Sequence, residues 1–117
     1  MRTDDRNYFG RPSLVVRTLD IGNLQHLFRF PNGYGASVVQ GWSTYGGEQG
    51  LWELAVLSWP EANDSPDGHS LCYDTHITDD VLGWLSREEV ASLLDDIREL
   101  PTNPEIERRT RDTGTTV

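Results

Sequence analysis

The residue types best suited to catalysis lie in one short window of the sequence. Asp74, His76 and Asp79 bring a base and two acids together, with Asp80 alongside, and small hydrolases and transferases use such groups for proton transfer. Each residue also has a structural interpretation, because Asp in a turn bonds its own backbone and acids at a helix start complement the helix dipole. We favour the structural interpretation, so these residues are catalytic candidates without an assigned role.

The same window offers metal ligands in His69, Cys72 and His76. Structural zinc sites usually need four closely placed ligands, often including a pair of cysteines, whereas this chain has a single cysteine. We therefore predict no metal site. The glycine-rich segment 45–50 lacks the Lys and Ser/Thr of a phosphate-binding loop, and the sequence has no nucleophile elbow or dinucleotide fingerprint. No cofactor is predicted.

The net charge of −9 is concentrated in one part of the chain. Residues 58–99 contain eleven acids and two arginines, a surplus equal to the whole net charge, while the segments before and after are neutral. Such a surface repels phosphates and attracts basic partners, so direct nucleic-acid binding is disfavoured. A purely solubilising role would explain the same charge.

Chain length and cysteine content limit the number of domains and the cellular compartments to consider. The 117 residues suffice for one domain, and the single cysteine excludes an internal disulfide. The N-terminus has no secretory signal pattern, and no apolar run approaches the roughly 18 to 20 residues that span a bilayer. We expect a cytoplasmic protein that does not enter a membrane.

Strand and turn signals predict an antiparallel sheet of three to four strands in a meander. Short strands are expected over residues 13–19 and 70–73, and an apolar central strand over residues 51–59. Between the first and the central strand lies a hairpin at residues 30–34, where Pro presets the turn and Gly33 takes a left-handed conformation. This loop pairs Phe30 with Tyr34, Phe28 with Ala36, and His26 with Val38. A two-residue loop would scatter the apolar residues over both faces.

Two helices are predicted after the strands. Thr78, followed by acids, indicates a first helix that ends near Leu85. Ser86 and Glu89 form a capping box for a second helix that ends before Pro101. Its buried stripe, at helical spacing, consists of Val90, Leu93, Leu94 and Ile97.

The predicted fold class is therefore α+β, with both C-terminal helices packed on one face of the sheet. A single domain should span residues 13–101, preceded by a flexible arm at residues 1–12 and followed by a mobile tail at residues 102–117.

Burial of the second helix's stripe predicts which residues face a partner. It turns four acids toward solvent, namely Glu88, Asp95, Asp96 and Glu99. Trp42 and Trp59 are further candidates, because each is expected at a strand end with an exposed edge, and tryptophan is common at protein interfaces.

A resemblance adds a biological setting. The sequence contains FPNGYGASVV at residues 30–39, TYGG at 44–47, GLWELAVL at 50–57 and YDTHITDDVLGWL at 73–85. These segments, within residues 25–101, resemble a family of small uncharacterised proteins of actinobacterial phages and related bacteria. That family has no assigned activity to transfer. The resemblance implies a cytoplasmic protein in an infected host, where short accessory proteins often bind host machinery.

These observations favour a non-catalytic module that binds a protein with a basic surface. One form would inhibit or modulate a nucleic-acid-binding host protein. The contact would be made by the acidic second helix or by the mixed polar and apolar face of the hairpin, which carries Leu27, Arg29, Gly35, Ser37 and Val39. Two rivals stay open: a small hydrolase or transferase using Asp74, His76 and Asp79, and a self-associating structural accessory. No oligomeric state is predicted.

Overall fold

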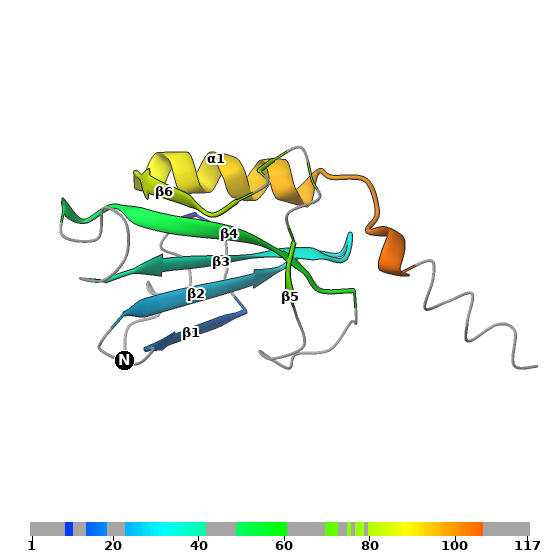
Figure 1. The fold of residues 1–117 in the computed structure, drawn as a ribbon, viewed down its shortest axis with the longest axis horizontal. Coiled ribbons are helices and arrows are strands. Elements are labelled where there is room, and N and C mark those ends of the chain that lie inside the picture. Colours follow the sequence, from blue (N-terminus) through cyan, green and yellow to red (C-terminus); the bar gives the residue numbers. More distant parts are fainter. Residues whose placement is uncertain are drawn as a thin grey trace, which may run out of the picture.

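The computed structural model describes residues 9–10, 14–18, 23–41, 49–60, 70–72, 75, 77–78 and 80–106 of the chain. Within these residues the elements are β1 (Val15–Thr18), β2 (Leu24–Arg29), β3 (Tyr34–Gln40), β4 (Trp52–Ser58), β5 (Ser70–Leu71), β6 (Leu82–Leu85) and α1 (Arg87–Arg98). A further helical turn spans residues 104–106. Figure 1 shows α1 running alongside β6 and β4.

The sheet is antiparallel, and β1 to β4 form a meander in sequence order. Both β5 and β6 pair with the outer edge of β4, β5 at Leu57 and Ser58 and β6 at Trp52 and Leu54. The α+β fold class, with an antiparallel meander and C-terminal helical segments, is confirmed. The short strand expected at residues 70–73 is present as β5, and the unpredicted β6 raises the number of strands above the predicted three to four (Figure 1).

The β2–β3 hairpin has the predicted register. Phe28 pairs with Ala36 and His26 with Val38, while the Phe30 N–H donates to the Tyr34 carbonyl at 2.8 Å. Gly33 has a φ of 87°, the left-handed conformation that glycine adopts without a steric penalty. The turn chemistry of a three-residue loop therefore sets which side chains face the helix.

The core lies between the sheet and α1. Alternation along β2, β3 and β4 places one set of apolar side chains on this face, including Phe28, Val38 and Leu54, which α1 covers with Val90, Leu94 and Ile97. His26 is part of this layer, with its ring centroid 5.5 Å from that of Trp52. The opposite face carries a smaller buried cluster of Leu27, Leu57 and Trp59, so the face predicted to be mixed is buried at its centre.

The predicted first helix, residues 78–85, is wrong, because Leu82–Leu85 form strand β6. The hydroxyl of Thr78 accepts from the Asp80 N–H at 3.0 Å and donates to the Asp80 carbonyl at 2.8 Å. The carboxylate of Asp80 accepts from the Val81 N–H at 2.7 Å. These polar side chains stabilise a turn that leads into a strand, and the same residue types cap helices elsewhere.

Two residues from the predicted arm and tail belong to the core. Phe9 is 3% exposed and packs edge-on against Trp52, with ring centroids 4.9 Å apart. Asn103 is also 3% exposed, and its side-chain amide donates to the Gly33 carbonyl at 2.8 Å and to the Ser58 hydroxyl at 2.9 Å. The folded unit therefore extends beyond the predicted boundaries on both sides, while most of the arm and of the tail lies outside the described residues.

Candidate functional site

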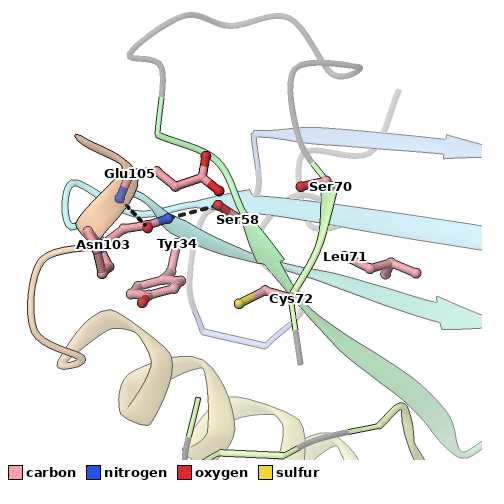
Figure 2. Close-up of a pocket in the computed structure, with 8 residues that line it drawn as sticks. Tyr34, Ser58, Ser70, Leu71, Cys72, Asn103 and Glu105 are labelled. Carbon is pink, nitrogen blue, oxygen red and sulfur yellow. Dashed lines mark hydrogen bonds between the residues drawn. The ribbon is translucent and has the colours of Figure 1, made fainter. Parts of the chain in front are cut away.

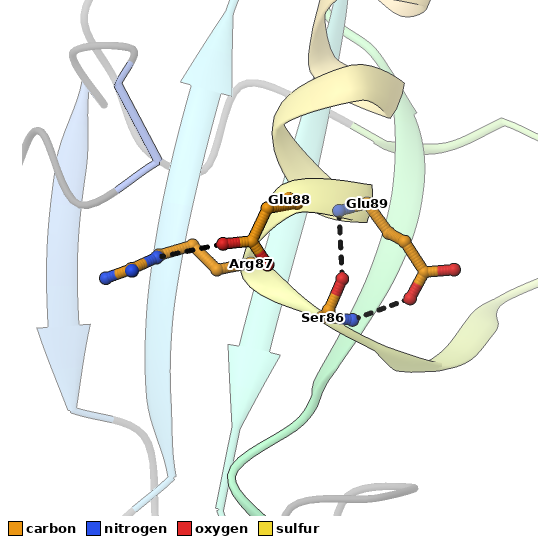
Figure 3. A network of polar contacts seen from close by, with 4 residues as sticks. All are labelled: Ser86, Arg87, Glu88 and Glu89. Atoms are coloured by element: carbon orange, nitrogen blue, oxygen red, sulfur yellow. Dashed lines mark hydrogen bonds and ion pairs between the residues drawn. The ribbon is translucent and has the colours of Figure 1, made fainter.

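The N-terminus of α1 is held by the predicted capping box, which Figure 3 shows. The Glu89 N–H donates to the Ser86 hydroxyl at 3.1 Å, and the Ser86 N–H donates to the Glu89 carboxylate at 2.9 Å. This pair satisfies two backbone donors that a helix start leaves open. It also removes Glu89 from the set of carboxylates that are available to a partner.

The buried stripe of α1 turns three of the four predicted acids toward solvent. Val90, Leu94 and Ile97 are fully buried, and Leu93 is partly buried against the same core. The residues between them face solvent, so Glu88, Asp96 and Glu99 are exposed and Asp95 is half-buried.

Two arginines accompany these acids. Arg87 Nε lies 4.0 Å from the Glu88 carboxylate (Figure 3), and Arg98 lies 3.7 Å from that of Asp95. Glu88 nevertheless has a side chain that is 81% exposed. Surface ion pairs of this kind are worth at most about 1 kcal/mol, so the acidic face stays accessible to a competing cation.

Trp84 is the surface tryptophan of the described structure. It is 58% exposed, and in the described part of the chain Leu71 is the other large hydrophobic residue that is exposed. Its φ is 61°, a left-handed conformation that costs a non-glycine residue roughly 1–2 kcal/mol. Strained residues of this kind cluster at functional positions.

A β-bulge places Trp84 in this conformation. Leu82 pairs with Leu54 and Leu85 pairs with Trp52, so two residues of β6, Gly83 and Trp84, oppose the single residue Glu53 of β4. The extra residue keeps Leu82 and Leu85 on the core side, and β-bulges of this kind re-aim a side chain at a sheet edge. Trp84 leads through Leu85 and Ser86 directly into α1.

Trp59 was predicted to have an exposed edge, and that prediction is wrong. It is 0% exposed and packs with Leu27 and Leu57 on the face of the sheet opposite α1. A Cβ on Gly35 would lie 3.2 Å from the Trp59 indole, so the glycine leaves the space that the ring fills. Trp42, the other predicted tryptophan, lies outside the described residues.

The predicted catalytic window cannot be assembled from the described residues. Asp74, His76 and Asp79 lie outside them, as does His69. Cys72 is described and is 8% exposed, with its N–H bonded to the Val56 carbonyl at 2.9 Å. Among the residues that are described, no group of three or more His, Cys, Asp or Glu side chains could hold a metal ion.

A small pocket of about 200 Å³ lies where the ends of β3, β4 and β5 meet the segment after α1 (Figure 2). Cross-strand pairing aligns Tyr34 with Ser58 and Ser58 with Ser70. Asn103 lines the pocket, and its side-chain amide donates to the Ser58 hydroxyl, as one of the dashed lines in Figure 2 shows.

The chemistry of this pocket is limited. The described side chains that line it include Cys72 and Glu105, and none of these described residues is His, Lys or Arg. A cysteine nucleophile needs a base within hydrogen-bond reach or a nearby cation that lowers its pKa. The described lining supplies neither group, and Asn103 anchors the chain after α1 through its bonds to Gly33 and Ser58.

The comparisons add no functional assignment. No model of a known protein family, no curated protein and no solved structure matches the chain, so the resemblance to phage proteins stays a prediction. Among the helices in the described ranges, none has the length and hydropathy needed to cross a bilayer.

Sequence reasoning missed Trp84 as a surface residue because it placed Trp84 inside a helix. The dipeptide Gly83-Trp84 was the available signal, since glycine inside a strand pattern often marks a bulge. Asn103 was missed as well, because its partners Gly33 and Ser58 are 70 and 45 positions away in the chain.

Proposed function

We propose that this protein is a non-catalytic module that binds a partner protein through the acidic face of α1. The observation that supports it is the orientation of α1: its apolar stripe is buried, its start is capped, and Glu88, Asp96 and Glu99 are exposed. A rigid helix presents these carboxylates without the loss of freedom that a disordered acidic segment would undergo on binding. The partner has a basic surface.

The acids of α1 form a row of negative charge along the helix. From Glu88 to Glu99 the helix axis advances by roughly 16 Å, so the four carboxylates lie on average about 5 Å apart along the axis. A nucleic-acid strand carries one phosphate per roughly 3.4 Å. A protein that binds nucleic acid would thus meet a row of negative charges that are more widely spaced than phosphates. We propose inhibition or modulation of such a protein as the biological role.

The test is an affinity measurement on a partner isolated with the full chain as bait. The triple variant Asp95→Ser, Asp96→Ser, Glu99→Gln should bind that partner at least about tenfold more weakly, with an unchanged melting temperature. Binding by the wild type should weaken with added salt, because exposed charges are screened.

A charge-matched control separates the acidic face from net charge. The variant Glu61→Gln, Asp64→Ser, Asp67→Ser removes the same number of charges from a segment outside the described residues, and it should keep wild-type affinity. A partner that binds the α1 variant as tightly as the wild type contradicts the proposal. Equal loss in both variants would show an effect of net charge alone.

A further inference from the structure

Trp84 has three properties that the fold alone does not require. The residue is 58% exposed, its backbone is left-handed with a φ of 61°, and it lies in a bulge of a strand whose described pairings are with Trp52 and Leu54. Glycine would adopt this backbone conformation without strain, and a polar residue would suit the exposure. The position therefore holds a large aromatic side chain at a cost to stability.

The charges around Trp84 determine what could cover it. Asp80 lies four residues before it and Glu88 four residues after it, both exposed, and Glu53 lies opposite the bulge on β4. The nearest cation in the sequence is Arg87, which lies 4.0 Å from the Glu88 carboxylate. In the described part of the chain no aromatic ring stacks on Trp84. The indole is thus an open aromatic face with acids on both sides in the sequence.

Charge complementarity distinguishes between two kinds of occupant. A second copy of this chain would also carry a net charge of −9, so the two acidic surfaces would repel each other. A basic segment would be attracted, and a Lys or Arg side chain placed over a Trp ring gains a cation–π interaction. Arg has the further advantage that its planar guanidinium stacks on the ring while its N–H groups reach carboxylates.

We propose that Trp84 is the anchor of the docking surface, and that its indole stacks on an arginine of a basic segment in the partner protein. Asp80 and Glu88, four residues to either side of Trp84 in the sequence, add negative charge that attracts the basic neighbours of this arginine. The proposal rests on the proposed function, because it places one contact with the same partner protein at the end of β6 that leads into α1. It makes Trp84 the residue on which affinity depends most, as buried aromatic anchors do at other interfaces.

The test uses the full chain and a defined probe, an arginine-rich peptide of about twelve residues, beside the same peptide with citrulline in place of arginine. Citrulline keeps the shape of the side chain and removes its charge. Wild-type protein should bind the arginine peptide at least tenfold more tightly than the citrulline peptide. The indole N–H resonance of Trp84, assigned by its loss in Trp84→Gly, should shift on titration with the arginine peptide alone.

Variants at Trp84 separate the ring from the fold. Trp84→Gly should bind the arginine peptide at least tenfold more weakly while its melting temperature stays equal or rises, because glycine relieves the left-handed strain. Trp84→Phe should retain an intermediate affinity, since it keeps an aromatic face with a weaker cation interaction. Trp84→Leu should bind as weakly as Trp84→Gly.

Failure of this proposal can be told apart from failure of the proposed function. Wild-type affinity in Trp84→Gly, or equal binding by Trp84→Leu and wild type, overturns the stacked arginine. So does a wild-type protein that does not bind the peptide at millimolar concentration. If Trp84→Gly binds the captured partner normally while the α1 triple variant does not, the result supports binding by the acidic face and contradicts the role of Trp84 as an anchor.

Discussion

The side-chain amide of Asn32 donates to the carbonyl of Ile97 at 2.9 Å, and it also lies 3.0 Å from the Arg98 carbonyl and 3.1 Å from that of Leu100. The hairpin loop therefore caps the C-terminus of α1, where the last carbonyls have no partner within the helix. The carbonyl oxygen of the same amide accepts from the Tyr34 N–H at 3.1 Å, which fixes its orientation.

Asn32→Ala should destabilise the fold by about 1–2 kcal/mol, because the carbonyls of Arg98 and Leu100 lose this donor, whereas the Ile97 carbonyl still accepts from the Leu100 N–H at 3.2 Å. Thermal or denaturant unfolding measures the change. Asn32→Asp is the informative companion, since it keeps the acceptor for Tyr34 but puts a negative charge at the negative end of the helix dipole. It should be at least as destabilising as Asn32→Ala; a neutral effect of both would contradict the cap.

Gly33 and Gly50 form a matched pair for testing how the hairpin packs against the chain after α1. Both have positive φ, 87° and 76°, so alanine at either position introduces a similar backbone strain of about 1 kcal/mol. A Cβ at Gly33 would also lie 2.9 Å from the Asn103 Cβ, whereas a Cβ at Gly50 meets nothing within 4 Å.

Gly33→Ala should therefore lower the free energy of unfolding by at least about 1 kcal/mol more than Gly50→Ala does. Gly33→Val should be worse still, because a β-branched residue is an outlier at positive φ. Equal melting temperatures for Gly33→Ala and Gly50→Ala would argue against the close approach to Gly33 of Asn103 and of Ile106, the two residues that a Cβ there would meet.

The two leucines at the centre of α1 should contribute differently to the free energy of unfolding, although their side chains are identical. Leu94 is fully buried, whereas Leu93 is only partly buried. Leu94→Ala should cost about 2–5 kcal/mol, in line with cavity formation in a core. Leu93→Ala should cost clearly less, and chemical denaturation would measure both. The reverse order would mean that α1 is rotated from the orientation that exposes Glu88, Asp96 and Glu99.

Protein purified without chelator should contain well under one zinc per chain by elemental analysis. The reason lies in the sequence, which offers one cysteine and two nearby histidines where structural sites usually have four ligands. Cys72 is 8% exposed and takes part in the edge pairing of β4. Stoichiometric zinc that Cys72→Ser removes would instead make His69, Cys72 and His76 ligands.

The sequence predicts those features best whose cause is local. The hairpin register follows from the turn residues at 31–33, and the capping box of α1 follows from Ser86 and Glu89. The orientation of the acidic face follows in turn from the spacing of the apolar residues on one helix. None of these features depends on a distant part of the chain.

The wrong predictions have two causes: a residue spacing that fits both a helix and a bulged strand, and contacts between residues that are distant in the sequence. Leu82 and Leu85 are three residues apart, which is helical spacing; in a regular strand they would point to opposite faces, but the bulge returns both to the core. The burial of Trp59 depends on the room left by Gly35 on another strand. Neither fact can be read from neighbouring residues, and the surface position of Trp84 follows from the first.

The pairing of β5 and β6 along β4 affects how readily the chain aggregates while it is being synthesised. β4 is strongly apolar, and an open edge on such a strand is a template for aggregation by intermolecular β-pairing. The edge of β4 is closed at residues 57–58 by β5 and at residues 52–54 by β6, and both of these strands follow β4 in the chain. During synthesis β4 therefore leaves the ribosome before its cover exists. A chain that stops before Ser70 should aggregate, even though β1 to β4 are complete.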